Sequence, residues 1–150
     1  LPGRNSGTYE VVATTILHGK SFTAPANTAN SSPEMFAFVR DHPGAIGMIG
    51  LNWINQFKDT MKVLELADPD APDSLGTRGQ YFKSHQAYIF ERRYPLTRDI
   101  YILSRGDSYS VGGGFIGFVN SAPGQRIVLN SGLVPATMPV RLVSLTNKGQ

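Results

Sequence analysis

The segment Arg4-Asn5-Ser6-Gly7-Thr8 holds the residues of this chain that are best suited to chemistry. A loop of small residues that runs into a helix presents free backbone N–H groups at the positive end of that helix. The hydroxyls of Ser6 and Thr8 add hydrogen-bond donors, and Arg4 adds a charged fork that fits a tetrahedral anion. The segment predicts an oxyanion cradle that also uses the backbone at Gly7. The alternative interpretation is an ordinary capped helix with an exposed arginine.

A second glycine-rich pattern is much less specific. Gly112, Gly114 and Gly117 match the dinucleotide fingerprint as a string. That fingerprint requires a preceding strand and an acidic residue about 20 positions later. Residues 108–150 contain no aspartate or glutamate, so nucleotide binding is not expected. Close packing at a helix start explains these glycines better.

Catalytic and metal-binding patterns are also weak. No two histidines stand at ligand spacing, and the chain has no cysteine, so we expect no metal site and no thiolate chemistry. Ser6 does not stand in a Gly-x-Ser-x-Gly elbow, and no histidine–carboxylate pair can be assigned to it. We therefore expect a protein that is not an enzyme and that uses no cofactor. The residues weighed for these roles are His18, His42, His85, Asp68, Asp70 and Asp73.

Composition predicts a folded chain and gives no sign of nucleic-acid binding. Hydrophobic residues make up 41% and charged residues 17% of the 150 residues, which favours a packed core. The net charge is +3, and the whole excess falls in residues 108–150, which carry three basic residues. Three charges over that length form no basic stripe, so we expect no nucleic-acid partner. No apolar run approaches the roughly 18 residues of a membrane span.

Hydrophobic periodicity and turn residues predict alternating helices and strands, which is typical of an α/β architecture. The expected helices are residues 7–18, a helix that starts at Ser32-Pro33-Glu34 and ends at His42-Pro43-Gly44, residues 51–57, a short helix near Gln86–Phe90, one from Ser108 or Ser110 through Val119, and one from Pro123 to Gly132. The expected strands are residues 45–50, 61–66, 98–103 and 140–145, with a surface loop over residues 67–79.

Several segments in series resemble the substrate-binding proteins of phosphate ABC transporters. The residues around Ser6-Gly7-Thr8 resemble the phosphate loop of that family, although Arg4 stands two residues before Ser6 where the family arginine stands four before it. Further matching segments follow in the family's order and cover most of the chain. They are His42-Pro43-Gly44-Ala45-Ile46-Gly47, Tyr94-Pro95-Leu96-Thr97-Arg98, Phe115 to Val119, Gly124-Gln125-Arg126 and Gly132-Leu133-Val134-Pro135.

This resemblance implies a type 2 periplasmic-binding-protein-like lobe, in which a mixed sheet is flanked by helices, followed by a helical C-terminal segment. Residues 1–105 would form the second lobe with its return strand, and residues 106–150 would pack on the first lobe. The first lobe is absent, so we expect the chain to be the C-terminal portion of a longer protein. The apolar residues of 106–150 would then pack back onto residues 1–105 or onto a second copy in a homodimer.

The implied function is that of an extracytoplasmic solute-binding component in the periplasm or at the cell envelope. Arg4, Ser6, Gly7 and Thr8 would bind inorganic phosphate or another tetrahedral oxyanion without turnover, and a membrane permease would receive it. Every one of these groups is a donor, so phosphate and sulfate should bind alike, in the millimolar range. Two alternatives remain open: a signalling or scaffold relative without a ligand, and an oxyanion-processing hydrolase.

Overall fold

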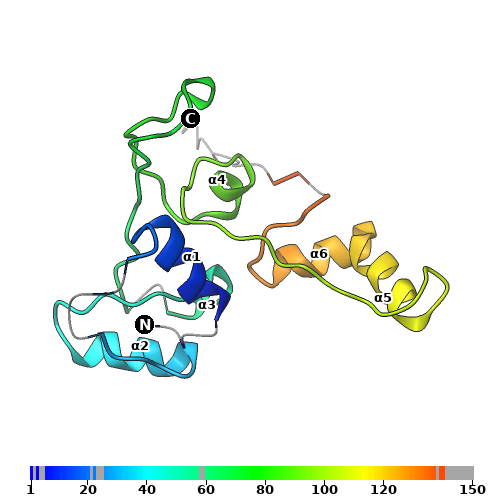
Figure 1. The fold of residues 1–150 in the computed structure, drawn as a ribbon, viewed down its shortest axis with the longest axis horizontal. Coiled ribbons are helices and arrows are strands. Elements are labelled where there is room, and N and C mark those ends of the chain that lie inside the picture. Colours follow the sequence, from blue (N-terminus) through cyan, green and yellow to red (C-terminus); the bar gives the residue numbers. More distant parts are fainter. Residues whose placement is uncertain are drawn as a thin grey trace, which may run out of the picture.

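The computed structural model describes residues 1, 3, 6–20, 22, 26–57, 60–137 and 139–140. Over these residues the chain forms six α-helices and one short 3-10 helix (Figure 1). All six predicted helices are confirmed, and the 3-10 helix lies in the predicted surface loop. Their bounds are α1 Gly7–Thr15, α2 Ser32–Asp41, α3 Leu51–Phe57, η1 Asp73–Leu75, α4 Gln86–Phe90, α5 Val111–Asn120 and α6 Ala122–Asn130.

Serine side chains cap several of these helices, which explains why the helix starts were predictable. The N-cap of α2 is Ser31, one residue before the predicted start, and its Oγ accepts a hydrogen bond from the backbone N–H of Glu34 at 3.3 Å. Ser110 caps α5 in the same way, by accepting from Gly113 at 3.1 Å. Each cap satisfies a backbone donor that has no partner inside the helix.

Helix α1 ends at Thr15, three residues before the predicted end. Beyond it, Leu17 N–H donates to the carbonyl of Val12, and Gly19 N–H donates to the carbonyl of Ala13. His18 and Gly19 both have positive φ, at +49° and +78°. These left-handed residues turn the chain away, and glycine adopts such a conformation without steric cost.

The expected α/β lobe with a mixed sheet is wrong. The described residues are 40% helix and 2% strand and contain no sheet. Residues 45–50 and 98–103 are extended but form no strand ladder, and residues 61–66 contribute only an isolated antiparallel bridge between Leu66 and Phe82. Apolar runs predict extended backbone, but they do not supply the neighbouring strand that a sheet requires. Of the strand expected at residues 140–145, only Val140 lies among the described residues.

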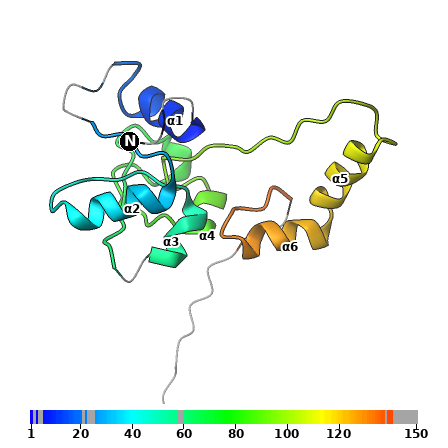
Figure 2. The same cartoon turned by 90° about the horizontal axis from the view of Figure 1, so that it is seen from below.

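Helices α1 to α4 gather at one end of the molecule, and α5 with α6 extends from it as an arm (Figures 1 and 2). The gathered part contains most of the small set of buried apolar side chains, such as Val12, Met35 and Ala87. In the arm, α5 and α6 pack against each other, yet Phe115 and Phe118 of α5 remain largely exposed. The division into residues 1–105 and 106–150 remains a prediction.

The end of α6 attaches the arm to the gathered helices. Nε2 of Gln86, the first residue of α4, donates to the backbone carbonyls of Leu129 at 2.9 Å and Leu133 at 2.6 Å. Gly132, at φ +82°, lies so close to the start of α3 that an added Cβ would stand 3.0 Å from Cα of Asn52. The C-terminal segment therefore contacts the gathered helices at the end of α6, whereas Phe115, Phe118 and Ile127, which were expected to be covered, remain exposed.

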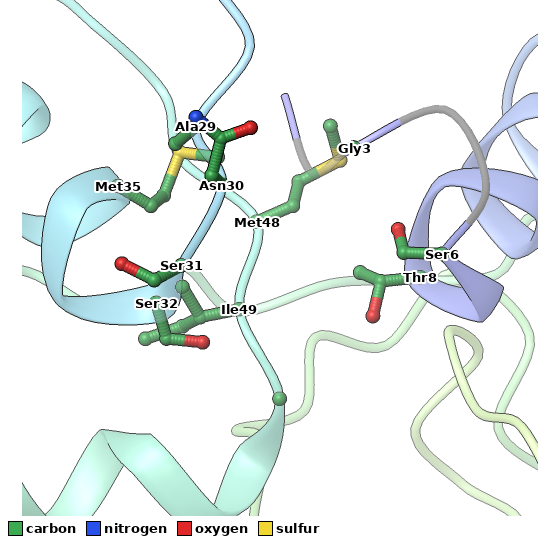
Figure 3. A pocket seen from close by; sticks show the side chains of 11 residues that line it. Gly3, Ser6, Thr8, Ala29, Asn30, Ser31, Ser32, Met35, Met48 and Ile49 are labelled. Atoms are coloured by element: carbon green, nitrogen blue, oxygen red, sulfur yellow. The ribbon is translucent and has the colours of Figure 1, made fainter.

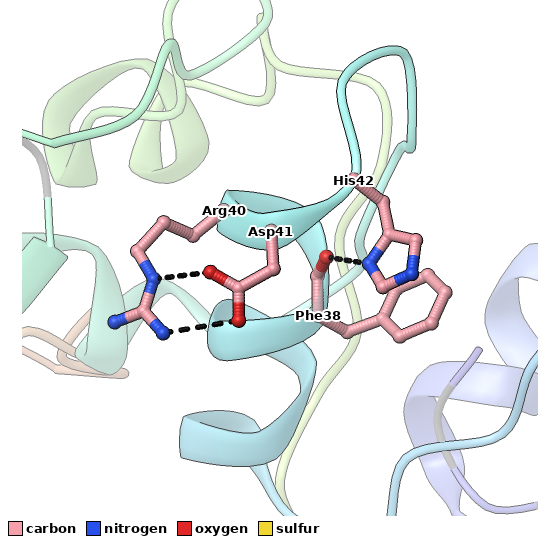
Figure 4. Close-up of polar contacts among 4 residues, drawn as sticks. All are labelled: Phe38, Arg40, Asp41 and His42. Carbon is pink, nitrogen blue, oxygen red and sulfur yellow. Dashed lines mark hydrogen bonds and ion pairs between the residues drawn. The ribbon is translucent and has the colours of Figure 1, made fainter.

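Local contacts also end α2 (Figure 4). Nδ1 of His42 lies 2.8 Å from the carbonyl oxygen of Phe38, and the two rings stack with centroids 4.0 Å apart. Arg40 and Asp41 form an exposed ion pair at 2.7 Å, which contributes little to stability in water. The contacts of His42 are therefore structural ones at the C-terminus of α2.

None of the helices in the described ranges combines the length and apolar character needed to cross a bilayer.

Candidate functional site

Ser6, Gly7 and Thr8, three of the four residues predicted to form an oxyanion cradle, lie at the start of α1. Ser6 is the N-cap, and its Oγ accepts from the backbone N–H of Tyr9 at 3.2 Å. That bond uses an oxygen lone pair, so the hydroxyl hydrogen of Ser6 remains available as a donor. Gly7 is the first helical residue and Thr8 follows it in the first turn. Arg4, the predicted charged member of the set, lies outside the described residues.

Ser6 and Thr8 line a hollow of about 170 Å³ between the starts of α1 and α2, which we call the α1–α2 hollow (Figure 3). A single water requires roughly 10–15 Å³ of such space, so the hollow admits a group of several heavy atoms. Its lining is completed by Gly3, Ala29, Asn30, Ser31, Ser32, Met35, Met48, Ile49 and Gly50.

The start of α2 supplies the other side of the hollow. Figure 3 shows Ser31 and Ser32 across from Ser6 and Thr8, with Met48 and Ile49 between them. Ser31 is the N-cap of α2 and, like Ser6, uses its oxygen to accept from its own helix. Two helix starts with serine caps therefore converge on one space. From the sequence, Ser32 was predicted only as part of a helix start and Ser31 was not singled out, because nothing in the local pattern places α2 beside α1.

Residues 45–50 pack on α2, and three of them, Met48, Ile49 and Gly50, line the hollow together with Ser6 and Thr8. A Cβ on Gly47 would lie 2.7 Å from Cγ2 of Val39 and 3.1 Å from Cγ of Met35, so this backbone packs directly on α2. Because Met48 and Ile49 follow immediately, the packing of Gly47 fixes where the hollow ends.

Arg98 lies next to the start of α1. A Cβ added to Gly7 would stand only 3.0 Å from Nη1 of Arg98, so the guanidinium group packs against the first residue of the helix. Arg98 belongs to the Tyr-Pro-Leu-Thr-Arg segment, and Gly7 belongs to the Ser-Gly-Thr segment. The structure brings these two segments together. The sequence analysis quoted Arg98 for the resemblance but did not include it among the site residues.

The electrostatics of the hollow favour an anion. Two helix N-termini carry partial positive charge, and the described side chains that line the hollow include no carboxylate. The carboxylate of Glu34 accepts from Asn30 N–H at 2.8 Å and lines a separate, smaller hollow. Glu10, the nearest acid expected from the sequence, is exposed and does not line the α1–α2 hollow. The lining side chains can therefore donate to an oxyanion but offer it no charged acceptor.

The same lining does not fit a hydrolytic centre. Nucleophilic catalysis by serine needs a base within hydrogen-bond reach and a group that orients that base. Among the described residues, no histidine, carboxylate or lysine lines the hollow, and no cluster of three metal-ligating side chains occurs in the same part of the chain. The described lining therefore offers hydroxyl and backbone groups but no side chain that commonly serves as a general base.

Comparison with protein-family models, with curated proteins and with solved structures finds no match to this chain.

Proposed function

We propose that this chain binds inorganic phosphate or another tetrahedral oxyanion in the α1–α2 hollow, as part of an extracytoplasmic solute-binding component of an ABC transporter. Ser6, Gly7 and Thr8 bind the anion from α1, and Ser31 and Ser32 bind it from α2. The protein carries the anion without chemical turnover and presents it to a membrane permease. The transport role rests on the resemblance described above, and the anion site rests on the geometry of the hollow.

The observation that carries the proposal is the convergence of two serine-capped helix starts on one space without a carboxylate. A helix N-terminus attracts an anion with about 0.3–1 kcal/mol at an exposed site. A hydroxyl hydrogen bond contributes about 1 kcal/mol. Each effect alone is ordinary, but a tetrahedral anion has enough oxygens to accept from both helices at once.

Arg98 supplies a positive charge next to the start of α1, although it does not itself line the hollow. Its guanidinium group already packs against Gly7, and the long side chain can turn its N–H groups toward an anion at the start of α1. Because Arg98 is exposed, solvent and salt screen the attraction. The expected affinity is therefore low, near 4 kcal/mol, which corresponds to a dissociation constant of about 1 mM.

Selectivity between phosphate and sulfate should be absent. Monohydrogen phosphate differs from sulfate by a proton, and strong recognition of that proton requires a charged acceptor such as a carboxylate. The lining side chains that the structure describes include hydroxyls but no carboxylate. We expect the two anions to compete for the same residues with dissociation constants that agree within about twofold, which is about 0.4 kcal/mol.

The test is a titration of the full chain with phosphate at low ionic strength, followed by NMR shifts of backbone amides. Thr8→Val removes one donor from the hollow and keeps the side-chain shape, so it should weaken binding roughly fivefold, or about 1 kcal/mol. Thr14→Val is the matched control. Thr14 lies on the same helix, where its Oγ1 donates to the carbonyls of Glu10 and Val11, and it does not line the hollow.

Ser32→Ala provides the second arm, because Ser32 lines the hollow while Ser31 makes the cap. Weakening by both Thr8→Val and Ser32→Ala, with Thr14→Val unchanged, supports one site made by two helices. Shifts confined to α1, with no effect of Ser32→Ala, would reduce the site to a single helix start. No phosphate-dependent shift at 20 mM phosphate would contradict the proposal and favour a module that binds no oxyanion.

A further inference from the structure

Residues 97–109 form a continuous exposed stretch between the gathered helices and α5 (Figure 2). Its apolar side chains are unusually open to solvent, with Ile100 61%, Tyr101 79% and Leu103 94% exposed. Residues 98–104 belong to no helix, turn or strand, and the chain runs there in a long, drawn-out course (Figure 2). None of their backbone groups hydrogen-bonds to another backbone group among the described residues. A stretch of this kind offers both a free backbone edge and apolar surface to a partner.

Both faces of this extended segment are apolar. Side chains alternate between faces along extended backbone, so Ile100 and Ile102 share one face while Tyr101 and Leu103 share the other. The hydroxyl of Tyr101 donates to Oδ2 of Asp99 at 3.3 Å, which places these two side chains on the same face. A strand that is apolar on both faces is suited to pairing and burial rather than to an exposed edge.

We propose that residues 99–105 pair antiparallel with the same segment of a second copy of this chain, around a two-fold axis at Ile102. In this register Asp99 of each copy stands opposite Arg105 of the other, so the two ends of the ladder carry opposite charges. Tyr101 stands opposite Leu103, and Ile102 stands opposite its own copy. An antiparallel pairing of identical segments buries the same residues on both copies, as closed two-fold dimers do.

Charge complementarity and the length of the open segment select this register over its neighbours. A shift by one residue in one direction places Arg98 opposite Arg105, and like charges directly opposite are destabilising. The opposite shift would pair Arg98 with Asp107, which lies beyond the bends at Arg105 and Gly106. A shift by two residues centres the pair on Tyr101 and leaves Asp99 opposite Leu103. Centring on Ile102 is the one antiparallel self-pairing in which Asp99 meets Arg105. The extended backbone reaches Ser104 and bends at Arg105, which makes Arg105 the last residue able to pair.

Cysteine crosslinking tests the register directly, because the natural chain contains no cysteine. Ile102→Cys places two sulfurs across the axis, where cross-strand Cα atoms stand about 4.5–5.5 Å apart and can form a disulfide. Ile100→Cys is the matched control, because its two copies lie about 14 Å apart at 3.4 Å per residue. We expect oxidation to give a covalent dimer with Ile102→Cys and mostly monomer with Ile100→Cys. Equal crosslinking at both positions would overturn the register.

Exchange of the charges at positions 99 and 105 tests whether the partner is a second copy of this chain. Dimerisation of the full chain is measured by sedimentation equilibrium at low ionic strength. Asp99→Arg alone should weaken dimerisation at least tenfold, and Arg105→Asp alone should do the same, because each change opposes like charges at both ends of the ladder. The double variant Asp99→Arg/Arg105→Asp restores opposite charges and should recover the affinity. Asp99 and Arg105 are both exposed in the monomer, so these substitutions should not affect folding. Failure of the double variant to recover would overturn the pairing.

Phe115→Lys distinguishes a dimer contact made by residues 99–105 from one made by the exposed face of α5. It should leave the dimer intact, whereas Ile102→Lys should abolish it by placing two ammonium groups on the axis. The reverse result would assign the contact to α5 and overturn the proposal. A chain that stays monomeric at 0.5 mM would overturn it as well.

Discussion

The hairpin of α5 and α6 and the pair of α1 and α2 are built from the same local signals but differ in what covers them. Both pairs begin on serine N-caps. In the α1 and α2 pair, residues 45–50 pack on α2, and Val12 and Met35 are buried. In α5, no side chain is buried, and Val111 is 93% exposed. Caps decide where a helix starts, and only tertiary contacts decide whether its apolar face is covered.

The largest difference between the two regions should appear at their glycines. Gly47→Val should destabilise the chain by about 3 kcal/mol, because even a Cβ would stand 2.7 Å from Val39 in the contact with α2. Gly117→Val is the matched change in α5, where a Cβ would meet nothing within 4 Å. It should change stability by no more than about 0.5 kcal/mol. Urea unfolding followed by circular dichroism measures the free energy of unfolding of both variants. Equal losses of stability would contradict the proposed difference in packing between the two regions.

Gln86 joins the two regions, so its removal should separate them. Gln86→Leu removes two hydrogen bonds to the carbonyls of Leu129 and Leu133 and should cost about 2 kcal/mol. Hydrogen exchange should accelerate in α5 and α6 while the protection of α1 and α2 remains. Gln80→Leu is the control, because Gln80 makes one exposed bond to the carbonyl of Gly76. Uniform acceleration across all helices would show instead that the two regions unfold as one unit.

The sequence predicted the helices because their signals are local. A serine followed by a proline or by small apolar residues marks a start, and a glycine such as Gly132 marks an end within a few positions. The same reasoning placed Ser6 and Thr8 at the start of α1, where the structure has them. The three-residue error at the end of α1 arose because His18 adopts a left-handed conformation that no residue type required.

What the sequence could not predict depends on partners distant in the chain. Ser32 faces the hollow only because Gly47 packs on α2 and brings residues 45–50 beside α1. Arg98 reaches Gly7 across about 90 positions of sequence, a contact that no local pattern encodes. The absent sheet has the same cause: residues 98–103 are extended as predicted, but hydrogen-bond partners for them are a property of the whole fold.

In contrast to the destabilising substitutions above, a substitution on the solvent-exposed side of α5 should stabilise the chain. Gly114→Ala should stabilise the chain by about 0.5–1 kcal/mol, because alanine loses less backbone freedom than glycine in a helix and a Cβ at Gly114 meets nothing within 4 Å. Gly113→Ala is the control one residue earlier, where a Cβ would lie 2.6 Å from the carbonyl of Asp107, and it should destabilise. Thermal unfolding distinguishes the two signs. A loss of stability with Gly114→Ala would indicate that another surface covers this face of α5.

The smallest effect concerns Tyr94, which precedes the exposed residues 97–109. Burial raises the pKa of the Tyr94 phenol above its usual value near 10, since the low-dielectric surroundings disfavour the phenolate. The folded chain therefore holds this proton to higher pH than the unfolded chain does. Stability from this difference is fully present below pH 10 and is lost as the pH rises through the raised pKa. Tyr94→Phe should flatten the decline in urea midpoint between pH 9.5 and 11, whereas Tyr109→Phe, at a tyrosine that is 98% exposed, should leave the decline unchanged. Identical profiles for Tyr94→Phe and the natural chain would show that residues 94–96 separate from the gathered helices as freely as the exposed stretch that follows them.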